Sequence, residues 1–330
     1  MNQLWTLYHP EIPQFLRDFA RTPPMERLRY VGMNCGCEYT DFPLFRNLAP
    51  YSRYDHSLGV ALIVWHFTGS EQQALAGLFH DVTTPVFAHV VDFLNGDHLR
   101  QESTEAGVEA CLLSSSEICA LLREYGIMPG EIADYHCYPV ADNDAPALSA
   151  DRLEYTVGNL LNYGFMDLEQ LRGFYEDLEV GWDERGYPEL TFRTPEVAAA
   201  FARAALRTAR VYVSDEDRFA MEALAGLLRT AMERKVLSSG DLLTTEPEVI
   251  KKLRRDAFCA AEWEQFRGYS RILRSADRPE TGAWLRVDAK KRWIDPLARG
   301  CGRVSVWDAA AAEEMRAFRE LDFSDWLCGE

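Results

Sequence analysis

Apolar residues recur at the three- and four-residue spacing of an α-helix along most of this chain. The run from Leu58 to Trp65 and the run from Ala74 to Phe79 both follow this period, and the triplet Thr-Gly-Ser at 68–70 separates them. Both runs are long enough for buried helices rather than strands. The pattern therefore predicts two consecutive helices joined by a short turn, and the same period predicts another helix over 151–161.

The second half of the chain predicts more helices and then a small mixed region. Residues 195–211 and 216–236 are rich in strong helix formers, and Ser-Ser-Gly at 238–240 ends that run. Beyond it, the patterns predict short strands at Trp284–Asp288 and Arg303–Val306 and then a helix at Ala309–Leu321. We therefore expect a mainly α protein, with a helical domain over 1–237 and a small α+β C-terminal appendage over 238–330.

Composition limits the classes of partner. The chain has 330 residues, of which 47% are hydrophobic and 26% are charged, as is typical of a globular protein. Lys and Arg number 35 against 52 Asp and Glu, so the formal net charge is −17 and repels polyanions at long range. Nucleic acid is therefore an unfavourable partner, whereas a small phosphate ester can bind where a basic patch or a metal ion reverses the field.

We expect a cytoplasmic protein that does not span a membrane. The first residues, Met-Asn-Gln-Leu-Trp-Thr, lack the basic and apolar regions of a secretory signal. The longest nearly apolar run, Gly59 to Trp65, is far shorter than the roughly 20 residues that cross a bilayer. Of the eight cysteines, only Cys35 and Cys37 form a close pair, which favours reduced thiols over a zinc site.

Four potential metal ligands lie at the ends of predicted helices. His56 opens one apolar helix, His80 and Asp81 end the next, and Asp151 opens a third. Imidazole nitrogen and carboxylate oxygen bind hard to borderline divalent cations, and four such ligands leave positions open for a water and a phosphoryl oxygen. The sequence therefore predicts one divalent metal ion, and this mixed ligation does not select among manganese, iron, magnesium, nickel and zinc.

Three motifs resemble those of the HD-domain metal-dependent phosphohydrolases. Residues 53–59 read Arg-Tyr-Asp-His-Ser-Leu-Gly, and residues 80–89 read His-Asp-Val-Thr-Thr-Pro-Val-Phe-Ala-His. Within that superfamily the chain is most similar to the deoxynucleoside triphosphate triphosphohydrolases, whose Asp-Lys-x-Asp-Tyr resembles Asp-Arg-Leu-Glu-Tyr at 151–155. The resemblance is strong over residues 20–165. It implies an HD-domain helical bundle whose metal ligands are His56, His80, Asp81 and Asp151.

The resemblance also implies a general acid. The histidine that closes the second motif and the acid three residues later correspond to His89 and Asp92. Residues three apart share a helix face, so Asp92 would orient the His89 ring and raise its pKa, keeping the ring protonated near neutrality. The alternative is that His89 packs between Phe87 and Phe93 while Asp92 is solvated. The resemblance places His98 in the active site as well.

Three more residues are candidates for substrate contact. Arg53 would neutralise phosphate charge, with an ordinary surface salt bridge as the alternative. Tyr155 would stack on a sugar or base, with a place in the core as the alternative. Thr84 stands where the family has a substrate-facing histidine, and a hydroxyl is neither a cation nor a proton donor at pH 7. The basic run 290–292 is interpreted as a solvated charge cluster, with phosphate contact as the alternative.

The predicted function is hydrolysis of a phosphoester or phosphoanhydride of a nucleotide by a metal-activated water. A deoxynucleoside triphosphate is one candidate substrate. Two alternatives stay open: a phosphatase of nucleoside monophosphates, and a nucleotide-binding sensor that has lost turnover. The expected partner is a small nucleotide or phosphate ester, and a homo-oligomer is a further expectation.

Overall fold

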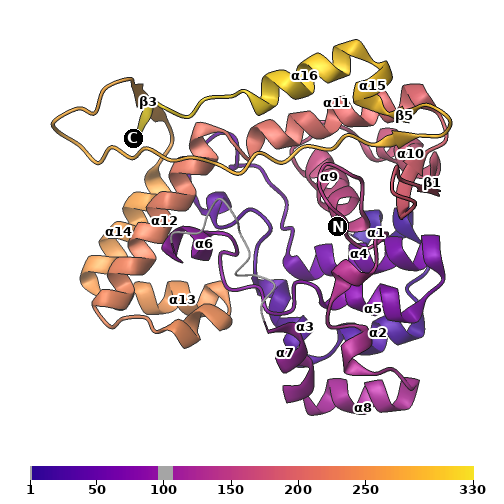
Figure 1. Ribbon diagram of the computed structural model, residues 1–330. Helices are drawn as coiled ribbons and strands as arrows, with labels where there is room; N and C mark the ends of the chain where they lie inside the picture. The colour runs from indigo at the N-terminus through magenta and orange to yellow at the C-terminus, as the bar shows by residue number, and fades with distance from the viewer. Residues whose placement is uncertain (1, 96–106) are drawn as a thin grey trace.

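The computed structural model describes residues 2–95 and 107–330, and most of these residues are helical (Figure 1). The prediction of a mainly α fold is confirmed. No helix in this part of the chain combines the length and the apolar character needed to cross a membrane. The helices are α1 (Asn2–Tyr8), α2 (Gln14–Ala20), α3 (Pro23–Arg27), α4 (Arg53–Thr68), α5 (Glu71–Phe79), α6 (Val90–Asn95), α7 (Val108–Ser114), α8 (Ser116–Tyr125), α9 (Ala150–Asn162), α10 (Leu168–Glu176), α11 (Pro195–Val211), α12 (Asp215–Glu233), α13 (Glu246–Leu253), α14 (Ala257–Gly268), α15 (Val304–Trp307) and α16 (Ala309–Arg319).

Short 3-10 helices and strands complete the fold. The 3-10 helices are η1 (Leu28–Tyr30), η2 (Cys37–Tyr39), η3 (Pro129–Glu131), η4 (Tyr135–Cys137) and η5 (Ser239–Leu243), and the strands are β1 (Leu178–Trp182), β2 (Pro188–Phe192), β3 (Ile272–Ser275), β4 (Leu297–Ala298), β5 (Gly302–Arg303) and β6 (Trp326–Gly329). One sheet has the order β1-β2-β4-β5, with β2 parallel to β4 and Thr191 opposite Leu297. Strands β3 and β6 form a separate antiparallel pair.

The first predicted helix pair is present as α4 and α5. Ser52 caps α4 in a capping box, because its hydroxyl accepts from the Asp55 amide while the Asp55 carboxylate accepts from the Ser52 amide. Gly69 ends α4 at φ +62°, a left-handed conformation that costs glycine little. Ser70 then caps α5 by accepting a hydrogen bond from the Gln73 amide. The predicted turn at 68–70 is confirmed.

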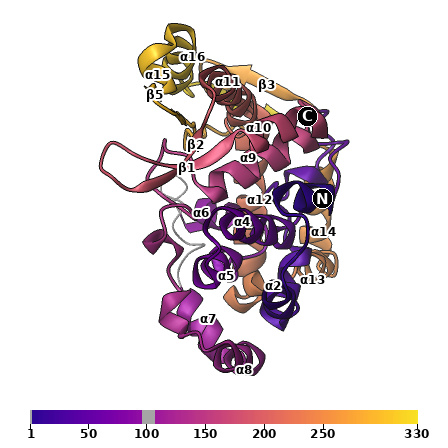
Figure 2. The same ribbon diagram turned by 90° about the vertical axis from the view of Figure 1, so that its right-hand side faces the viewer.

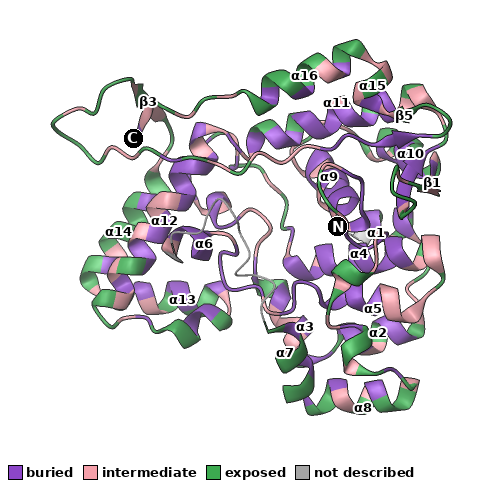
Figure 3. Ribbon diagram, in the orientation of Figure 1, coloured by how far each residue is buried: buried purple, intermediate pink, exposed green. Residues whose placement is uncertain are grey.

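Helix α9 crosses α4 closely in the interior. Gly59 of α4 permits this approach, because a Cβ at that position would lie 2.6 Å from Glu154 Oε1 on α9. In Figure 3, α4 and α9 are largely buried, whereas α8 and α16 expose many residues. Since α5 runs back along α4, the beginning of α4, the end of α5 and the beginning of α9 meet inside the protein.

Two hydrophobic clusters form the core. The larger cluster joins α1, α2, α4, α5, α9 and α11, and the smaller joins α6, α12, α13 and α14. Trp263 of α14 is the largest fully buried side chain in the described residues and packs against Phe87 in the smaller cluster. Figures 1 and 2 show α13 and α14 stacked beside α12, and α7 and α8 together at the lower end.

Between β3 and β4, the chain returns across the molecule as an extended coil over residues 276–296 (Figure 1). The strand predicted at 303–306 is wrong, because Val304–Trp307 is the helix α15. Val304 is fully buried and Val306 is 78% exposed, so their alternation does not mark one face of a strand. The strand predicted at 284–288 is reduced to one bridge, from Leu285 to Leu327. The helix predicted at 309–321 is confirmed as α16, and the boundary near residue 238 stays a prediction.

Candidate metal centre and its cavity

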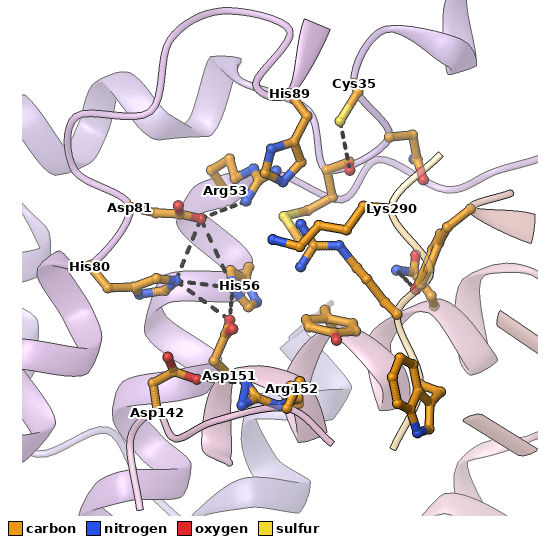
Figure 4. A pocket seen from close by; sticks show the side chains of 18 of the residues that line it. Cys35, Arg53, His56, His80, Asp81, His89, Asp142, Asp151, Arg152 and Lys290 are labelled. Atoms are coloured by element: carbon orange, nitrogen blue, oxygen red, sulfur yellow. Dashed lines mark hydrogen bonds and ion pairs between the residues drawn. The ribbon is translucent and has the colours of Figure 1, made fainter. Parts of the chain in front are cut away.

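Three of the predicted ligands, from three helix ends, meet at one point (Figure 4). His56 Nε2 lies 3.2 Å from His80 Nε2 and 3.0 Å from Asp151 Oδ1. His80 Nε2 lies 3.7 Å from the same carboxylate oxygen. The ligand atoms that the three residues offer all lie within 4.8 Å of one another. Both histidines are buried, and Asp151 is partly open to the cavity described below.

Hydrogen bonds on the far side of each ring orient the converging nitrogens. His80 Nδ1 donates to the Gly77 carbonyl oxygen at 2.7 Å, and His56 Nδ1 donates to Glu154 Oε2 at 2.6 Å. In each neutral ring the Nε2 atom is then a lone-pair acceptor. Two lone pairs and a carboxylate oxygen at this range repel one another unless a cation lies between them. The donor set therefore fits a divalent cation. The two rings that would hold it are already oriented by the Gly77 carbonyl and by Glu154.

Charges around the centre favour a cation strongly. Burial alone would lower the pKa of His56, but hydrogen bonds with Asp151 and Glu154 outweigh it and raise the pKa to about 10. Burial would raise the pKa of Asp151, but His56 and His80 hold it well below its usual range. The centre therefore attracts one positive charge, which a proton on His56 or a metal ion can supply.

Asp81, the fourth predicted ligand, lies at the edge of this centre. Its Oδ2 atom is 3.6 Å from His80 Nε2 and 4.0 Å from His56 Nε2, and Arg53 donates to it at 2.8 Å. Thr84 donates to Oδ1 of the same carboxylate at 2.7 Å. Burial would raise the pKa of Asp81, but Arg53 and the two histidines hold it well below its usual range. Asp81 is therefore an ionised group that Arg53 and Thr84 fix in direction.

The residues predicted to contact the substrate do not all lie on the wall of the cavity. Thr84 is fully buried behind Asp81 and does not belong to the cavity wall among the residues described. Arg53 does lie on the wall, but its partner is Asp81 and its salt bridge is internal rather than on the surface. Tyr155 lies on the wall as well, on α9. His98 falls within 96–106, outside the described residues.

His89 and Asp92 are in contact, as the motif predicts. His89 Nδ1 lies 2.9 Å from Asp92 Oδ2, and the Asp92 side chain is fully buried, so the alternative with a solvated Asp92 is wrong. The two residues before His89, Phe87 and Ala88, have φ of +58° and +45°, a left-handed conformation that is uncommon outside glycine. Such strain is tolerated where the surrounding structure fixes the backbone, and it is frequent at functional sites.

The predicted protonation of His89 is not what the structure favours. Asp92 does raise the pKa of His89, but burial lowers it more, and the positive charges of Arg292 and Arg53 act in the same direction as burial. The net pKa is lowered, so His89 is a neutral ring in the protein without substrate. The prediction considered only Asp92 on the same segment and missed the positive charges of Arg292 and Arg53, which come from other segments.

A cavity of about 630 Å³ connects the metal centre with His89 and Tyr155. The basic run 290–292 lines its wall, with Lys290 exposed and Lys291 and Arg292 half-buried, so the run is partly solvated and also faces the cavity. Phosphate contact by this run stays a prediction. His136 also lies on the wall, with Nδ1 2.9 Å from Asp142 Oδ2.

Sequence reasoning gave no role to Glu154, which orients the His56 ring. The signal was present, because Glu154 lies three residues after Asp151 on α9, and residues at that spacing share a helix face. Nothing in the local sequence marked Asp142, His136 or the 290–292 run as neighbours of the metal centre. They come from loops that only the folded chain brings together.

Among known proteins, the chain is similar to a protein of Cordyceps militaris named metal-dependent phosphohydrolase cns2. The two are 23% identical over 258 residues, which cover 74% of this chain and 70% of that protein. The chain is also 27% identical over 240 residues to the uncharacterized protein YdhJ of Bacillus subtilis, covering 72% of this chain and 70% of that protein. No protein-family model matches the chain. A distant homologue is thus named as a metal-dependent phosphohydrolase, and the His/His/Asp cluster fits an HD-type site.

Proposed function

We propose that this protein is an HD-type metallohydrolase that cleaves a phosphoester or phosphoanhydride of a nucleotide. The observation that carries the proposal is the convergence of His56, His80 and Asp151 at the wall of a large cavity. The relative named metal-dependent phosphohydrolase supports the same reaction class. A nucleotide as substrate, with a deoxynucleoside triphosphate among the candidates, is supported by the sequence resemblance and by Tyr155, whose ring can pack on a sugar or base.

The residues have separate tasks in this proposal. His56, His80 and Asp151 hold the metal ion, and Asp81 completes the ligand set from the edge of the centre. When bound, the ion would supply Lewis acidity and a water of lowered pKa. Glu154 and the Gly77 carbonyl keep the two rings from turning, so little reorganisation is needed when the ion binds.

His89 transfers a proton to the leaving oxygen. Asp92 holds Nδ1, which leaves Nε2 for the substrate. The ring is neutral before the substrate binds, and the negative charge of a bound phosphate then favours the protonated form. His89 therefore takes up its proton when the substrate binds. Arg53 adds positive charge beside the same phosphate and also holds Asp81 in position.

A metal-content measurement paired with a nucleotide panel tests the proposal. The protein is stripped with a chelator, reloaded separately with manganese, iron, magnesium, nickel or zinc, and incubated with dGTP and dAMP. Release of phosphate, pyrophosphate or triphosphate identifies the bond that is cleaved. We expect His56→Ala to lose both metal and activity, while His66→Ala, a control on the same helix but outside the described cavity wall, keeps both.

Two outcomes would contradict the proposal in different ways. Failure of the wild-type chain to retain any of these metals would remove the metal centre. Retention of metal and nucleotide without product under any condition would favour the sensor instead, because a sensor keeps the binding groups and lacks turnover.

A further inference from the structure

The cavity extends well beyond the metal centre along one side of α9. Its wall includes four residues at four-residue intervals: Asp151, Tyr155, Asn159 and Tyr163. Residues at this interval share one face of a helix. Tyr163, which directly follows α9, comes after Asp151 by three such intervals, a rise of about 18 Å along the helix axis. The cavity therefore has room for more of a substrate than the group that reacts at the metal.

Three segments build the cavity wall around Tyr163. Asn34 comes from the turn before η2, and its Oδ1 atom accepts a hydrogen bond from the Tyr163 hydroxyl at 3.3 Å. Asp217 and Met221 come from α12, where a four-residue interval puts them on one face. Burial is the main cause of the raised pKa of Tyr163, and the negative charge of Asp217 raises it further, so the two are within electrostatic range. We call these four residues the distal wall.

Asp217 is the acid of the distal wall, and little holds its carboxyl group in the charged form. Only 9% of the residue is exposed. In the part of the chain that the structure describes, the carboxyl group accepts a hydrogen bond from the Cys37 thiol at 3.9 Å, and a thiol is a weak donor. Arg218, the next residue, pairs with Asp215 at 2.6 Å instead. Burial therefore outweighs the charge of Arg218 and raises the pKa of Asp217 to about 8.

A carboxyl group that keeps its proton is a donor and an acceptor side by side. Its hydroxyl donates and its carbonyl oxygen accepts, whereas an ionised carboxylate only accepts. Enzymes use buried carboxylic acids as donors in this way. The matching partner presents an acceptor beside a donor. Heterocycles such as adenine and cytosine do so with a ring nitrogen beside an exocyclic amino group, and that ring nitrogen is a stronger base, and so a better acceptor, than a carbonyl oxygen.

The other side chains at this end of the cavity suit a flat ring. Met221 offers a polarisable surface and Tyr163 an aromatic one. The Tyr163 hydroxyl already donates to Asn34, and Asn159 Nδ2 already donates to the Tyr212 hydroxyl at 2.7 Å. Asp217 therefore keeps hydrogen-bonding capacity that these neighbouring groups have used.

The distal wall lies on the side of the cavity where the leaving group is expected. In the proposed function His89 protonates the leaving oxygen. Burial raises the pKa of the Cys35 thiol, Asp217 raises it further, and a hydrogen bond with the His89 backbone lowers it, so Cys35 is close to both. Figure 4 shows Cys35 and His89 on the same side of the cavity, across from Asp151. A ring carried by the leaving group would thus extend past Cys35 to Asp217.

We propose that Asp217 is a specificity residue whose carboxyl group pairs with a heterocycle that carries an exocyclic amino group beside a ring nitrogen, as in an adenine or cytosine nucleotide. The acid hydroxyl donates to the ring nitrogen, and the carbonyl oxygen accepts from the amino group. This inference rests on the proposed function for the position of the leaving group, and it specifies the substrate class by its ring.

Binding of free nucleosides tests the pairing without metal or turnover. At pH 6.5 we expect the protein to bind adenosine and cytidine about tenfold more tightly than uridine and guanosine, and Asp217→Ala to raise the calorimetric Kd of adenosine about tenfold. Asp217→Asn, whose amide keeps a donor beside an acceptor, should retain most of the affinity. Glu216→Gln removes an acid from the same helical turn, outside the described cavity wall, and should leave the Kd unchanged. Thermal unfolding checks that each variant is folded.

The pH dependence separates recognition of the ring from a structural role of Asp217. The wild-type Kd for adenosine should rise about tenfold between pH 6.5 and pH 9, because ionisation of the acid above about pH 8 removes the donor. In Asp217→Asn the Kd should stay constant over this range. The titratable groups around Asp217 on neighbouring segments include Cys35, Cys37, Glu38 and Tyr163, and all of them are still present in this variant.

Several results would overturn the inference. Binding of none of the four nucleosides, tighter binding of uridine and guanosine than of adenosine, or the same Kd in wild type and Asp217→Ala would each do so. The same pH dependence in wild type and Asp217→Asn would assign it to another group and have the same effect. A protein that binds adenosine through Asp217 but cleaves no nucleotide with any metal would contradict the proposed function and leave the pairing supported.

Discussion

Glu154 is the residue on which the orientation of the metal centre depends most. Its buried carboxylate accepts from His56 Nδ1 at 2.6 Å, from the Tyr51 hydroxyl at 2.5 Å and from the Tyr8 hydroxyl at 3.4 Å. Burial raises its pKa, while His56 and Tyr51 oppose that rise. Three donors from separate segments therefore hold one carboxylate, and that carboxylate holds the ring that must face the metal.

Replacing Glu154 tests this arrangement. We expect Glu154→Gln to weaken metal binding by about ten- to a hundredfold, because the amide supports the His56 ring less strongly than a carboxylate does. Calorimetric titration with manganese or zinc measures the change. Tyr51→Phe is the control, since it keeps the contact between Glu154 and His56 and should weaken binding less. Unchanged metal affinity in Glu154→Gln would show that the ring needs no such support.

His89 makes a second prediction at the scale of one residue. We expect His89→Ala to lower kcat by about 10²- to 10⁴-fold, the usual contribution of a general acid, with metal content unchanged. Asp92→Asn should lower kcat less, because the amide still positions the ring but no longer favours its protonated form. Phosphate release under saturating substrate measures both. Full activity in His89→Ala would assign the proton to another group.

At the scale of elements, the four-stranded sheet joins the coil that precedes β4, residues 285–296, to the beginning of α9. Glu189 of β2 is almost completely buried and accepts from Arg303 of β5 through both carboxylate oxygens, at 2.6 and 2.7 Å. The same carboxylate accepts from the Leu148 amide, two residues before α9. This small sheet thus fixes the helix that carries Asp151 relative to residues 285–296, which precede β4.

Removing Arg303 should reveal the cost of an unpaired buried carboxylate. We expect Arg303→Met to lower the free energy of unfolding by about 3–5 kcal/mol, because Glu189 loses its partner. Arg299→Met is the matched control, since the bridge of Arg299 to Glu179 is largely exposed and contributes no more than about 1 kcal/mol. Urea denaturation of both variants gives the comparison. Equal losses in the two would mean that burial of Glu189 does not matter.

At the scale of the whole molecule, two acids within residues 2–95 and 107–330 stand out because burial raises their pKa to about 8. Burial raises the pKa of Asp217, on the cavity wall, to about 8, against 3.8 for an ordinary aspartate. Burial and the nearby Glu246 raise the pKa of Glu38 to about 8 as well. The folded chain keeps protons on these groups at pH values where the unfolded chain has lost them. Their contribution to stability is therefore full at low pH and is lost as pH rises through about 8.

Asp217→Asn tests this linkage. Between about pH 5 and pH 8 the wild type should lose stability because unfolding releases the proton that folded Asp217 keeps, whereas the variant lacks this loss. The free energy of unfolding should therefore fall less steeply with pH in Asp217→Asn. Asp256→Asn is the control, because hydrogen bonds from the Cys259 amide and Arg234 lower the pKa of Asp256 to about 2. Its stability contribution is constant over this range, so its pH slope should match the wild type.

Local sequence was sufficient to predict several of the helices and to name the three residues of the His/His/Asp cluster. The α4–α5 pair, α9, α11 and α12 all follow from periodicity, caps and helix formers, because each signal acts within a few residues. Because His56, His80 and Asp151 lie at helix ends, the packing of the helices brings them together. The β1–β2 hairpin, whose strand β2 also pairs with β4 more than a hundred residues later, escaped prediction.

The sequence by itself determined that His56, His80 and Asp151 are able to bind a metal and that several segments, such as α4, α5, α9 and α12, are helical, because both depend on residue type and on spacing within one or two helical turns. Only the tertiary structure decided that Thr84 lies behind Asp81, that Glu154 orients His56, and that the positive charges of Arg292 and Arg53 lower the pKa of His89. Electrostatic effects act through space, so the protonation of His89 depends on charges from distant segments. Distances between such segments exist only in the folded chain.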